Sequence, residues 1–258
     1  MDSFSRIKIS LKKFLQLFIF FLFAGCASTV RVPTTSFTRS ENVGQAGATI
    51  ETFVTQAVRL QAAQDFRATP VNGTPRVDET VAMGFHGSLG FLNSLEFYWG
   101  WVPGGPNTAG LKFQFLGESF RTSKTGNFSL ALALGSGLYV ASAGVPADQV
   151  QGTPPTTRRG YIIEYASPHG ELSFGFRPFD ILLLNLGYYR SKMSYAVTFD
   201  EGIRDVYDRQ GTLTIVHLGA NVKYSILLLG LDIAKSQLTF GTLSQSNLSF
   251  GFNSGVVW

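Results

Sequence analysis

Long stretches of this chain alternate between large apolar and small residues, which is the period of a β-strand. From Phe128 to Ala141, six positions of one face carry Phe, Leu or Val, while the other face carries only Gly, Ala, Ser and one Tyr. The ranges 81–91 and 95–101 repeat this alternation. No stretch of ten or more residues has a convincing helical period, so the sequence predicts an all-β fold.

The small residues on the second face decide where such strands can lie. A strand of a soluble protein shows water a face with Lys or Glu, which resists edge pairing, whereas only 15% of this chain is charged. Small residues suit a crowded barrel interior, and Leu, Phe and Trp suit a lipid-facing surface. In lipid every backbone group must be hydrogen-bonded, so strands cross only as a closed barrel. Residues 45–258 are therefore predicted to form one antiparallel up-and-down transmembrane β-barrel.

Turn-forming stretches divide this region into segments of strand length. The connections alternate between tight turns and long loops, the latter at 62–76, 143–158 and 199–210. Bacterial barrels keep short turns on the periplasmic side and longer loops outside. An even strand number returns the chain to its starting side, so we expect about ten strands, with eight as the alternative. The ten predicted strands are 46–61, 77–91, 94–102, 109–119, 126–142, 159–176, 181–198, 211–223, 226–240 and 247–258.

The amino terminus has the parts of an export signal. Four basic residues precede an apolar run of 11 residues, which is shorter than the roughly 20 that a spanning helix needs. The sequence Leu-Phe-Ala-Gly-Cys that ends at Cys26 resembles the lipobox of bacterial lipoproteins, in which the chain is cut before the cysteine and the cysteine is acylated. We therefore expect a signal peptide over 1–25 and a lipidated polar tether over 26–44. Ordinary signal cleavage after Ala27 is the alternative.

Charge and cysteine content exclude several classes of function. Without the signal, 17 basic residues face 16 acidic ones, so no polybasic stripe supports a nucleic-acid partner. A single cysteine excludes an intrachain disulfide and a Cys-cluster metal site. We expect no metal and no cofactor.

The last strand ends the chain on an aromatic residue, with Phe250, Phe252, Val256 and Trp258 on one face. It resembles the carboxy-terminal assembly signal of Gram-negative outer-membrane β-barrel proteins. The resemblance implies a location in the bacterial outer membrane, outer-membrane lipids as the surroundings and the barrel-assembly machinery as a partner. It concerns an architecture over about 45–258 and no single functional family.

One pair of residues offers a weak catalytic candidate, since the standard enzyme motifs are missing. His86 and Ser88 are two residues apart on one strand face, and a base beside a hydroxyl is the minimum for nucleophilic catalysis. Lipid A deacylase barrels have a similar pair, but an asparagine follows it there, whereas Leu89 stands here. Since such a pair often occurs by chance, we expect no enzymatic activity.

Polar residues predicted to face the lumen form a larger set. A hairpin about Gly105 would make Glu96 and Lys112 diagonal neighbours within reach of an ion pair. A barrel of this size is nearly filled by side chains, which favours a polar plug over a narrow passage for small solutes. The expected lumen network is Glu96, Tyr98, Lys112, Gln114, Glu171, Asn185, His217, Asn221, Lys223 and Asp232.

The sequence thus predicts an outer-membrane β-barrel (lipo)protein with a structural or surface-interaction role. Its long loops would meet any extracellular partner, and limited passage of small solutes is a further hypothesis. Two alternatives stay open. One is a deacylase-like, lipid-modifying barrel enzyme that uses His86 and Ser88. The other is a soluble periplasmic β-barrel lipoprotein with inverted faces, which binds an apolar ligand inside.

Overall fold

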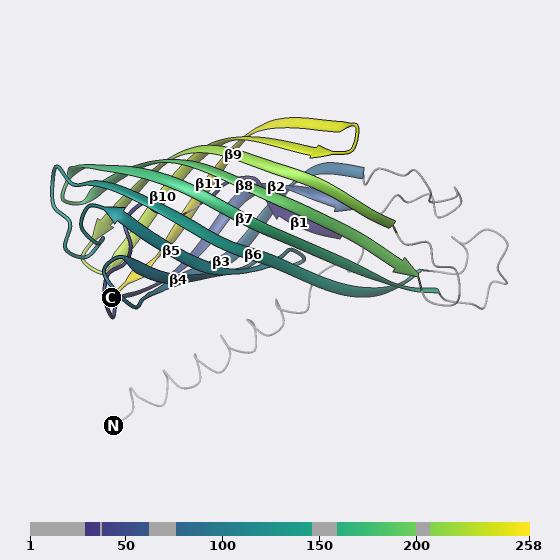
Figure 1. Cartoon of the computed structure of the whole chain (residues 1–258), viewed down its shortest axis with the longest axis horizontal. Helices are drawn as coiled ribbons and strands as arrows, with labels where there is room; N and C mark the ends of the chain where they lie inside the picture. The colour runs from purple at the N-terminus through teal and green to yellow at the C-terminus, as the bar shows by residue number, and fades with distance from the viewer. Residues whose placement is uncertain (1–28, 37, 62–75, 146–158, 200–206) are drawn as a thin grey trace, which may run out of the picture.

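The computed structural model describes residues 29–36, 38–61, 76–145, 159–199 and 207–258, so the expected signal peptide, Cys26 and most of the long loops lie outside the described residues. Strands β2 to β11 each pair antiparallel with the next, and β11 returns to β2, which closes a ten-stranded barrel (Figure 1). No helix in the described part is long and apolar enough to cross a membrane. The all-β barrel prediction is confirmed, and the eight-strand alternative is wrong. The strands are β1 (Thr29–Pro33), β2 (Ala48–Gln61), β3 (Arg76–Gly90), β4 (Leu95–Trp101), β5 (Asn107–Leu116), β6 (Phe128–Val145), β7 (Arg159–Phe179), β8 (Leu182–Phe199), β9 (Tyr207–Tyr224), β10 (Leu227–Phe240) and β11 (Leu243–Val257).

The observed bounds of the ten barrel strands agree with the predicted ones to within four residues. Strand β1 was not predicted, and it pairs with β2 alone. The register of the β4–β5 hairpin also differs from the prediction. Glu96 lies directly opposite Lys112, and Tyr98 lies opposite Gly110, because the hairpin turns about Gly104 and not about Gly105.

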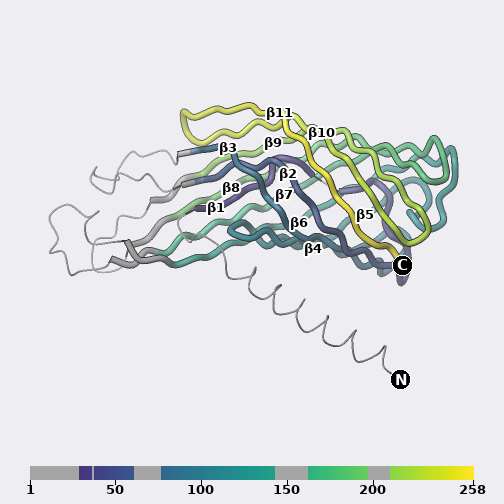
Figure 2. The backbone as a smooth tube through the Cα atoms, turned by 180° about the vertical axis from the view of Figure 1, so that it is seen from behind, coloured from purple at the N-terminus to yellow at the C-terminus, as the bar shows by residue number. Residues whose placement is uncertain are grey.

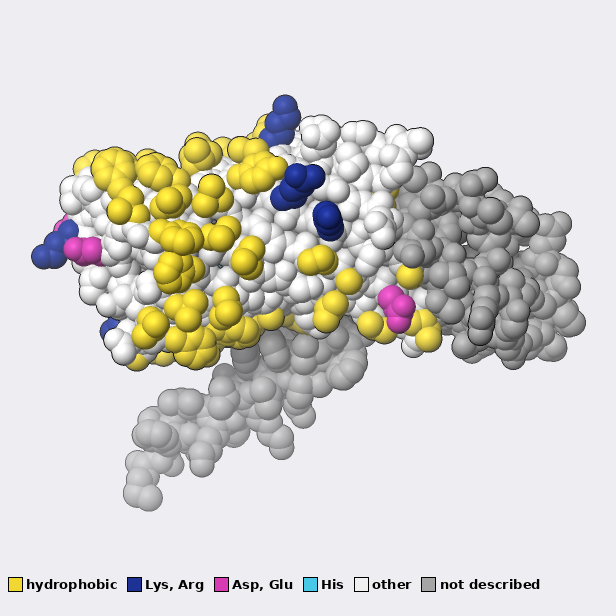
Figure 3. All heavy atoms as spheres, in the orientation of Figure 1, with side chains coloured by type: hydrophobic (Ala, Val, Ile, Leu, Met, Phe, Trp, Pro, Cys, Tyr) yellow, Lys and Arg dark blue, Asp and Glu magenta, His cyan; other side chains and the backbone are white. Residues whose placement is uncertain are grey.

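The outer wall carries a band of exposed apolar side chains. Along β10 the exposed and buried positions alternate without a break, and its outward residues are Leu227, Leu229, Leu231 and Ile233. Figure 3 shows apolar side chains gathered over the left half of this face, and several Lys and Arg side chains in its upper middle. Such a band is the surface that a transmembrane barrel presents to lipid. The inverted, soluble barrel is therefore wrong, because Leu and Phe face outward.

The two ends of the barrel differ. At the turn end, tight connections join β7 to β8 and β9 to β10, and Ala48 and Trp258 exchange backbone hydrogen bonds of 2.9 and 3.1 Å that close the barrel. At the loop end, the strands run toward the connections drawn in grey in Figure 2. The β4–β5 hairpin is much shorter than its neighbours, so β3 pairs with β4 only over Phe85–Gly90.

Candidate functional site

Residues 29–47, here called the luminal segment, run inside the barrel from the loop end to the turn end; residue 37 lies outside the described part (Figures 1 and 2). Thr29 pairs with Gln61, the last residue of β2, near the loop end. Ala46 donates its amide to the Gly90 carbonyl at 2.9 Å near the turn end. The interval expected as a polar tether is thus folded into the barrel from Thr29 onward, because its polar groups find hydrogen-bond partners on the inner wall.

Near the loop end the luminal segment contributes to an apolar cluster. Val30 and Val32 are buried against Val58 and Leu60 of β2 and against inward side chains of β7 to β10. The Arg31 amide donates to the Gly104 carbonyl at 2.8 Å, which holds β1 beside the tip of the β4–β5 hairpin. This layer fills the lumen on the loop side.

Lys112 connects the barrel wall to the middle of the luminal segment. Its Nζ lies 2.6 Å from Glu96 Oε1 and donates to the carbonyls of Arg39 and Glu41 at 3.0 and 3.1 Å. Glu96 uses its other oxygen to accept the Val43 amide at 2.7 Å. The ion pair expected between Glu96 and Lys112 therefore exists, and both partners also bind the backbone of the luminal segment.

Glu41 is fully buried and has donors on three sides. Arg177 Nη2 donates to Glu41 Oε2 at 2.5 Å, Ser123 Oγ donates to the same oxygen at 3.0 Å, and Asn127 Nδ2 donates to Oε1 at 2.7 Å. A buried carboxylate is stable only when it is paired and hydrogen-bonded in this way. In a second ion pair the luminal segment supplies the cation instead of the carboxylate: Arg39 donates to Glu51 on β2 at 2.5 Å.

Phe120 closes the lumen near the turn end. Its ring is almost fully buried, and the cationic groups of Arg39, Arg177 and Lys223 lie 5.2, 5.0 and 5.4 Å from the ring centre. Cations at this distance are attracted to the face of an aromatic ring. The Phe120 amide also donates to the Asn42 carbonyl at 2.7 Å, so this residue packs on the luminal segment and is bonded to it.

A second buried charge cluster lies on the opposite wall. His217 Nδ1 is 2.9 Å from Asp232 Oδ1, and His217 Nε2 is 2.9 Å from Glu171 Oε1, an arrangement that suits a ring protonated on both nitrogens. Ser36 of the luminal segment donates to the second oxygen of Glu171 at 2.6 Å. This cluster therefore also holds the luminal segment in place.

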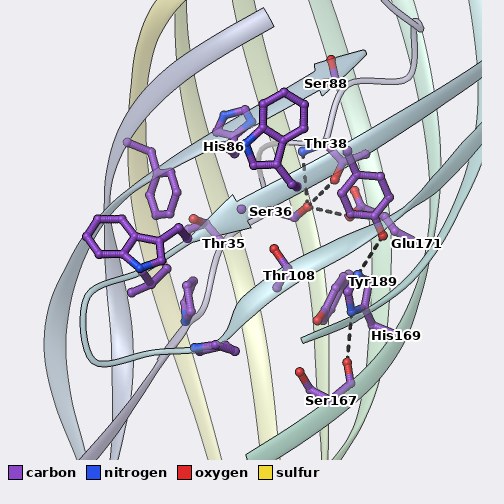
Figure 4. A pocket seen from close by; sticks show the side chains of 18 of the residues that line it. Thr35, Ser36, Thr38, His86, Ser88, Thr108, Ser167, His169, Glu171 and Tyr189 are labelled. Carbon is purple, nitrogen blue, oxygen red and sulfur yellow. Dashed lines mark hydrogen bonds between the residues drawn. The ribbon is translucent and has the colours of Figure 1, made fainter. Parts of the chain in front are cut away.

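A cavity of about 160 Å³ lies between the luminal segment and the wall formed by β3, β4, β5 and β7. Figure 4 shows His169, Glu171 and Tyr189 together on one side of it. The Nδ1 of His169 lies 3.1 Å from the Ser167 carbonyl and donates to it, so Nε2 accepts the Tyr98 hydroxyl at 2.8 Å. A cavity with this many polar groups suits ordered water.

His86 and Ser88 both face this cavity from β3 (Figure 4). The Ser88 and Thr49 hydroxyls share a hydrogen bond of 2.9 Å, and His86 Nε2 lies 3.5 Å from Glu51. Both residues thus have partners within the network that surrounds the luminal segment.

All ten residues of the expected lumen network face the interior. Four charged residues that bind in the same network were not predicted: Arg39, Glu41, Glu51 and Arg177. Alternation along the strands places Glu51 and Arg177 inward, so that pattern could have found them. Nothing in the sequence shows that Arg39 and Glu41 lie inside the barrel. Within the described residues, no group of three His, Cys, Asp or Glu could hold a metal ion.

No protein-family model matches this chain, and no curated protein matches it. Among solved structures, the chain is similar to the outer-membrane protease OmpT of Escherichia coli, with 10% identity over 82% of this chain and 95% of that one and a TM-score of 0.40. It is also similar to Ail, the attachment invasion locus protein of Yersinia pestis, with 8% identity over 83% of this chain and 99% of that one and a TM-score of 0.36. At such identity, function has to be argued from the residues of this chain.

Proposed function

We propose that this protein is a bacterial outer-membrane β-barrel that acts as a structural or surface-interaction protein, without enzymatic activity. The observation that carries the proposal is the pairing of an apolar outer wall with a lumen filled by the protein's own luminal segment. An apolar wall requires lipid around it, and a filled lumen leaves the loop-end surface as the place where the protein meets partners. The proposal includes the barrel-assembly machinery as a partner during insertion. It also includes the long loops, 62–76, 143–158 and 199–210, as the surface that would meet an extracellular partner.

The filled lumen argues against passage of solutes. The apolar cluster at the loop end, the charge network in the middle and Phe120 at the turn end succeed one another along the axis. Each layer is bonded or packed against the luminal segment, so the segment would have to leave before a pore could open.

The membrane location is tested by heat modifiability and carbonate extraction of the protein from cell membranes. We expect a faster-migrating band in unboiled samples and resistance to sodium carbonate. A carbonate-soluble protein without the shift would overturn the membrane proposal.

The closed lumen is tested by conductance in a planar bilayer. We expect no steady conductance from the parent protein and open channels from a variant that lacks residues 30–43, which serves as the positive control. Steady channels from the parent would show that the lumen conducts and that solute passage is part of the function.

A further inference from the structure

We infer that Arg190 and Lys192, on the outer wall of β8, form a binding site for the phosphate group of a membrane lipid. Thr212 and Thr214 of β9 complete the site. The inference rests on the proposed membrane location, and it gives the barrel a specific lipid contact on the loop side of the apolar band.

Arg190 and Lys192 lie where the outer wall of β8 changes from apolar to polar. The outward residues nearer the turn end include Leu184, Leu186 and Tyr188, which are exposed, and the two cations follow them on the same face. A strand rises about 3.3 Å per residue and barrel strands tilt by about 40°, so the cations lie about 20 and 25 Å from the start of β8 along the barrel axis. An apolar band about 25 Å tall ends at this level, which is the level of the lipid headgroups.

The neighbouring strand changes character at the same level. Val216 of β9 lies opposite Tyr188 and is exposed and apolar, whereas the next two outward residues of β9 are threonines. Thr214 lies opposite Arg190, and Thr212 lies opposite Lys192. An aromatic ring at the end of an apolar face is typical of the membrane interface, so Tyr188 marks the same boundary independently.

The four side chains surround an area that suits one phosphate group. Arg190 and Lys192 are two residues apart on one strand, or about 6.6 Å, and adjacent strands lie about 4.8 Å apart. Two cations and two hydroxyls can therefore meet at one anion. The guanidinium offers two parallel N–H donors that match two phosphate oxygens, and the ammonium adds a point charge.

The two cations have room for an anion beside them. Within the described residues, no carboxylate makes an ion pair with Arg190 or Lys192. On β7 the residue opposite Arg190 is Gly170, which has no side chain. The exposed carboxylate of β7, Glu164, lies opposite Ala196, four residues beyond Lys192 toward the loop end. A lipid phosphate would thus supply the counter-charge that the wall does not.

Lys235 on β10 is another exposed cation of the outer wall, but it has different neighbours. Directly opposite it lie Val216 of β9 and Leu248 of β11, which are both exposed and apolar. A single cation between apolar side chains offers a phosphate one contact, so Lys235 lies outside the site.

The phosphate site is tested on the folded barrel in neutral detergent, with each variant first checked for heat modifiability. Short-chain phosphatidic acid is the probe, and native mass spectrometry counts the lipids bound per protein. A basic residue at an anionic lipid surface contributes about fivefold in affinity, so Arg190→Gln with Lys192→Gln should weaken binding about 25-fold. Diacylglycerol with the same chains should bind the parent no more tightly than it binds this variant, because it lacks the phosphate.

Arg121→Gln with Lys124→Gln is the matched control, since it also removes one Arg and one Lys, from exposed positions at the turn end. This pair, and Lys235→Gln, should leave the affinity nearly unchanged. Equal weakening by both pairs would show that net charge alone attracts the lipid and would overturn the site. So would equal binding of phosphatidic acid and diacylglycerol by the parent, or displacement of the lipid by the same concentration of inorganic phosphate. Because heat modifiability reports the barrel itself, these failures are distinct from failure of the proposed function.

Discussion

Lys112 is a wall residue that also holds the luminal segment in place. Its side chain is 2% exposed, and its ammonium group binds Glu96 and two backbone carbonyls of the luminal segment. Replacing Lys112 by Met keeps the length of the side chain but leaves the Glu96 carboxylate buried without its cation. Removing one partner of a buried pair costs about 3–5 kcal/mol, so we expect Lys112→Met to lower the free energy of unfolding by that amount.

This prediction is measured by urea unfolding in lipid vesicles. Lys235 supplies the matched control, since it is exposed on the outer wall of β10, and Lys235→Met should change the free energy of unfolding by less than about 0.5 kcal/mol. The double variant Glu96→Gln with Lys112→Met should regain part of the loss, because no charge is then left alone. Equal effects of the two lysine substitutions would contradict the role given to Lys112.

Asp180, in the exposed turn between β7 and β8, links stability to pH. The hydroxyl and the amide of Thr125 both donate to Asp180 Oδ1 at 2.7 Å and lower the pKa of this carboxyl. A lowered folded-state pKa gives a stabilisation that is present above the ordinary pKa of aspartate and is lost as the pH falls through the lowered value. We expect Thr125→Val to raise the pKa of Asp180 toward its ordinary range, as measured by NMR titration. An unchanged titration curve would show that the hydroxyl does not act on the carboxyl.

At the scale of elements, alternation along the chain was enough to predict the barrel strands and their faces. It works over the apolar band of the outer wall, where large apolar residues point outward. Near the loop end the inward side chains of β7 to β10 are apolar as well, so the rule is weaker there. The interior partners on β5 and β9, such as Lys112 and His217, follow from that rule. The register of the β4–β5 hairpin did not follow, since a shift of two residues leaves every side chain on the same face.

The luminal segment could not be predicted from its own sequence. Residues 29–33 form a strand only because β2 offers them a free edge, and residues 34–45 are polar enough to pass for an exposed linker. Their burial depends on donors and acceptors that come from distant strands, such as Arg177 for Glu41 and Asn185 for Ser40. Gly44 and Ala46 show local constraints, with φ of 95° and 55° where the segment turns toward β2.

The threading of the luminal segment can be tested by a disulfide. Ser40 Oγ lies 2.7 Å from Ser129 Oγ on β6, so the tips of the two side chains, where cysteine would carry its sulfur, are in contact. We expect Ser40→Cys with Ser129→Cys to form a disulfide during export, seen as a mobility change on a denaturing gel without reductant. The control pair is Ser40→Cys with Ser249→Cys, because the Ser249 hydroxyl binds Thr34 instead. A bridge in the control pair and none in the test pair would contradict the path of the segment.

For the molecule as a whole, closure joins the two ends of the barrel sequence. Strand β11 pairs with β2 only over Gly251–Val257, and Trp258 completes the contact through Ala48. Strand β11, which we expect the barrel-assembly machinery to recognise, is therefore also the strand that closes the barrel. These two roles can be separated, because recognition takes place only in cells and closure takes place wherever the protein folds.

Phe252 on β11 and Leu231 on β10 give a matched pair for that separation. They lie directly opposite each other, and both are exposed on the apolar wall, at 44% and 62%. A polar residue at either site costs similar contact with lipid, so Phe252→Ser and Leu231→Ser should refold to the heat-modifiable form equally well in detergent. If the outward aromatic residues of β11 are the assembly signal, Phe252→Ser alone should strongly reduce the heat-modifiable protein in cell membranes. Equal loss from both variants in cells would show that the outer wall matters there only through its contact with lipid, and that β11 carries no separate signal.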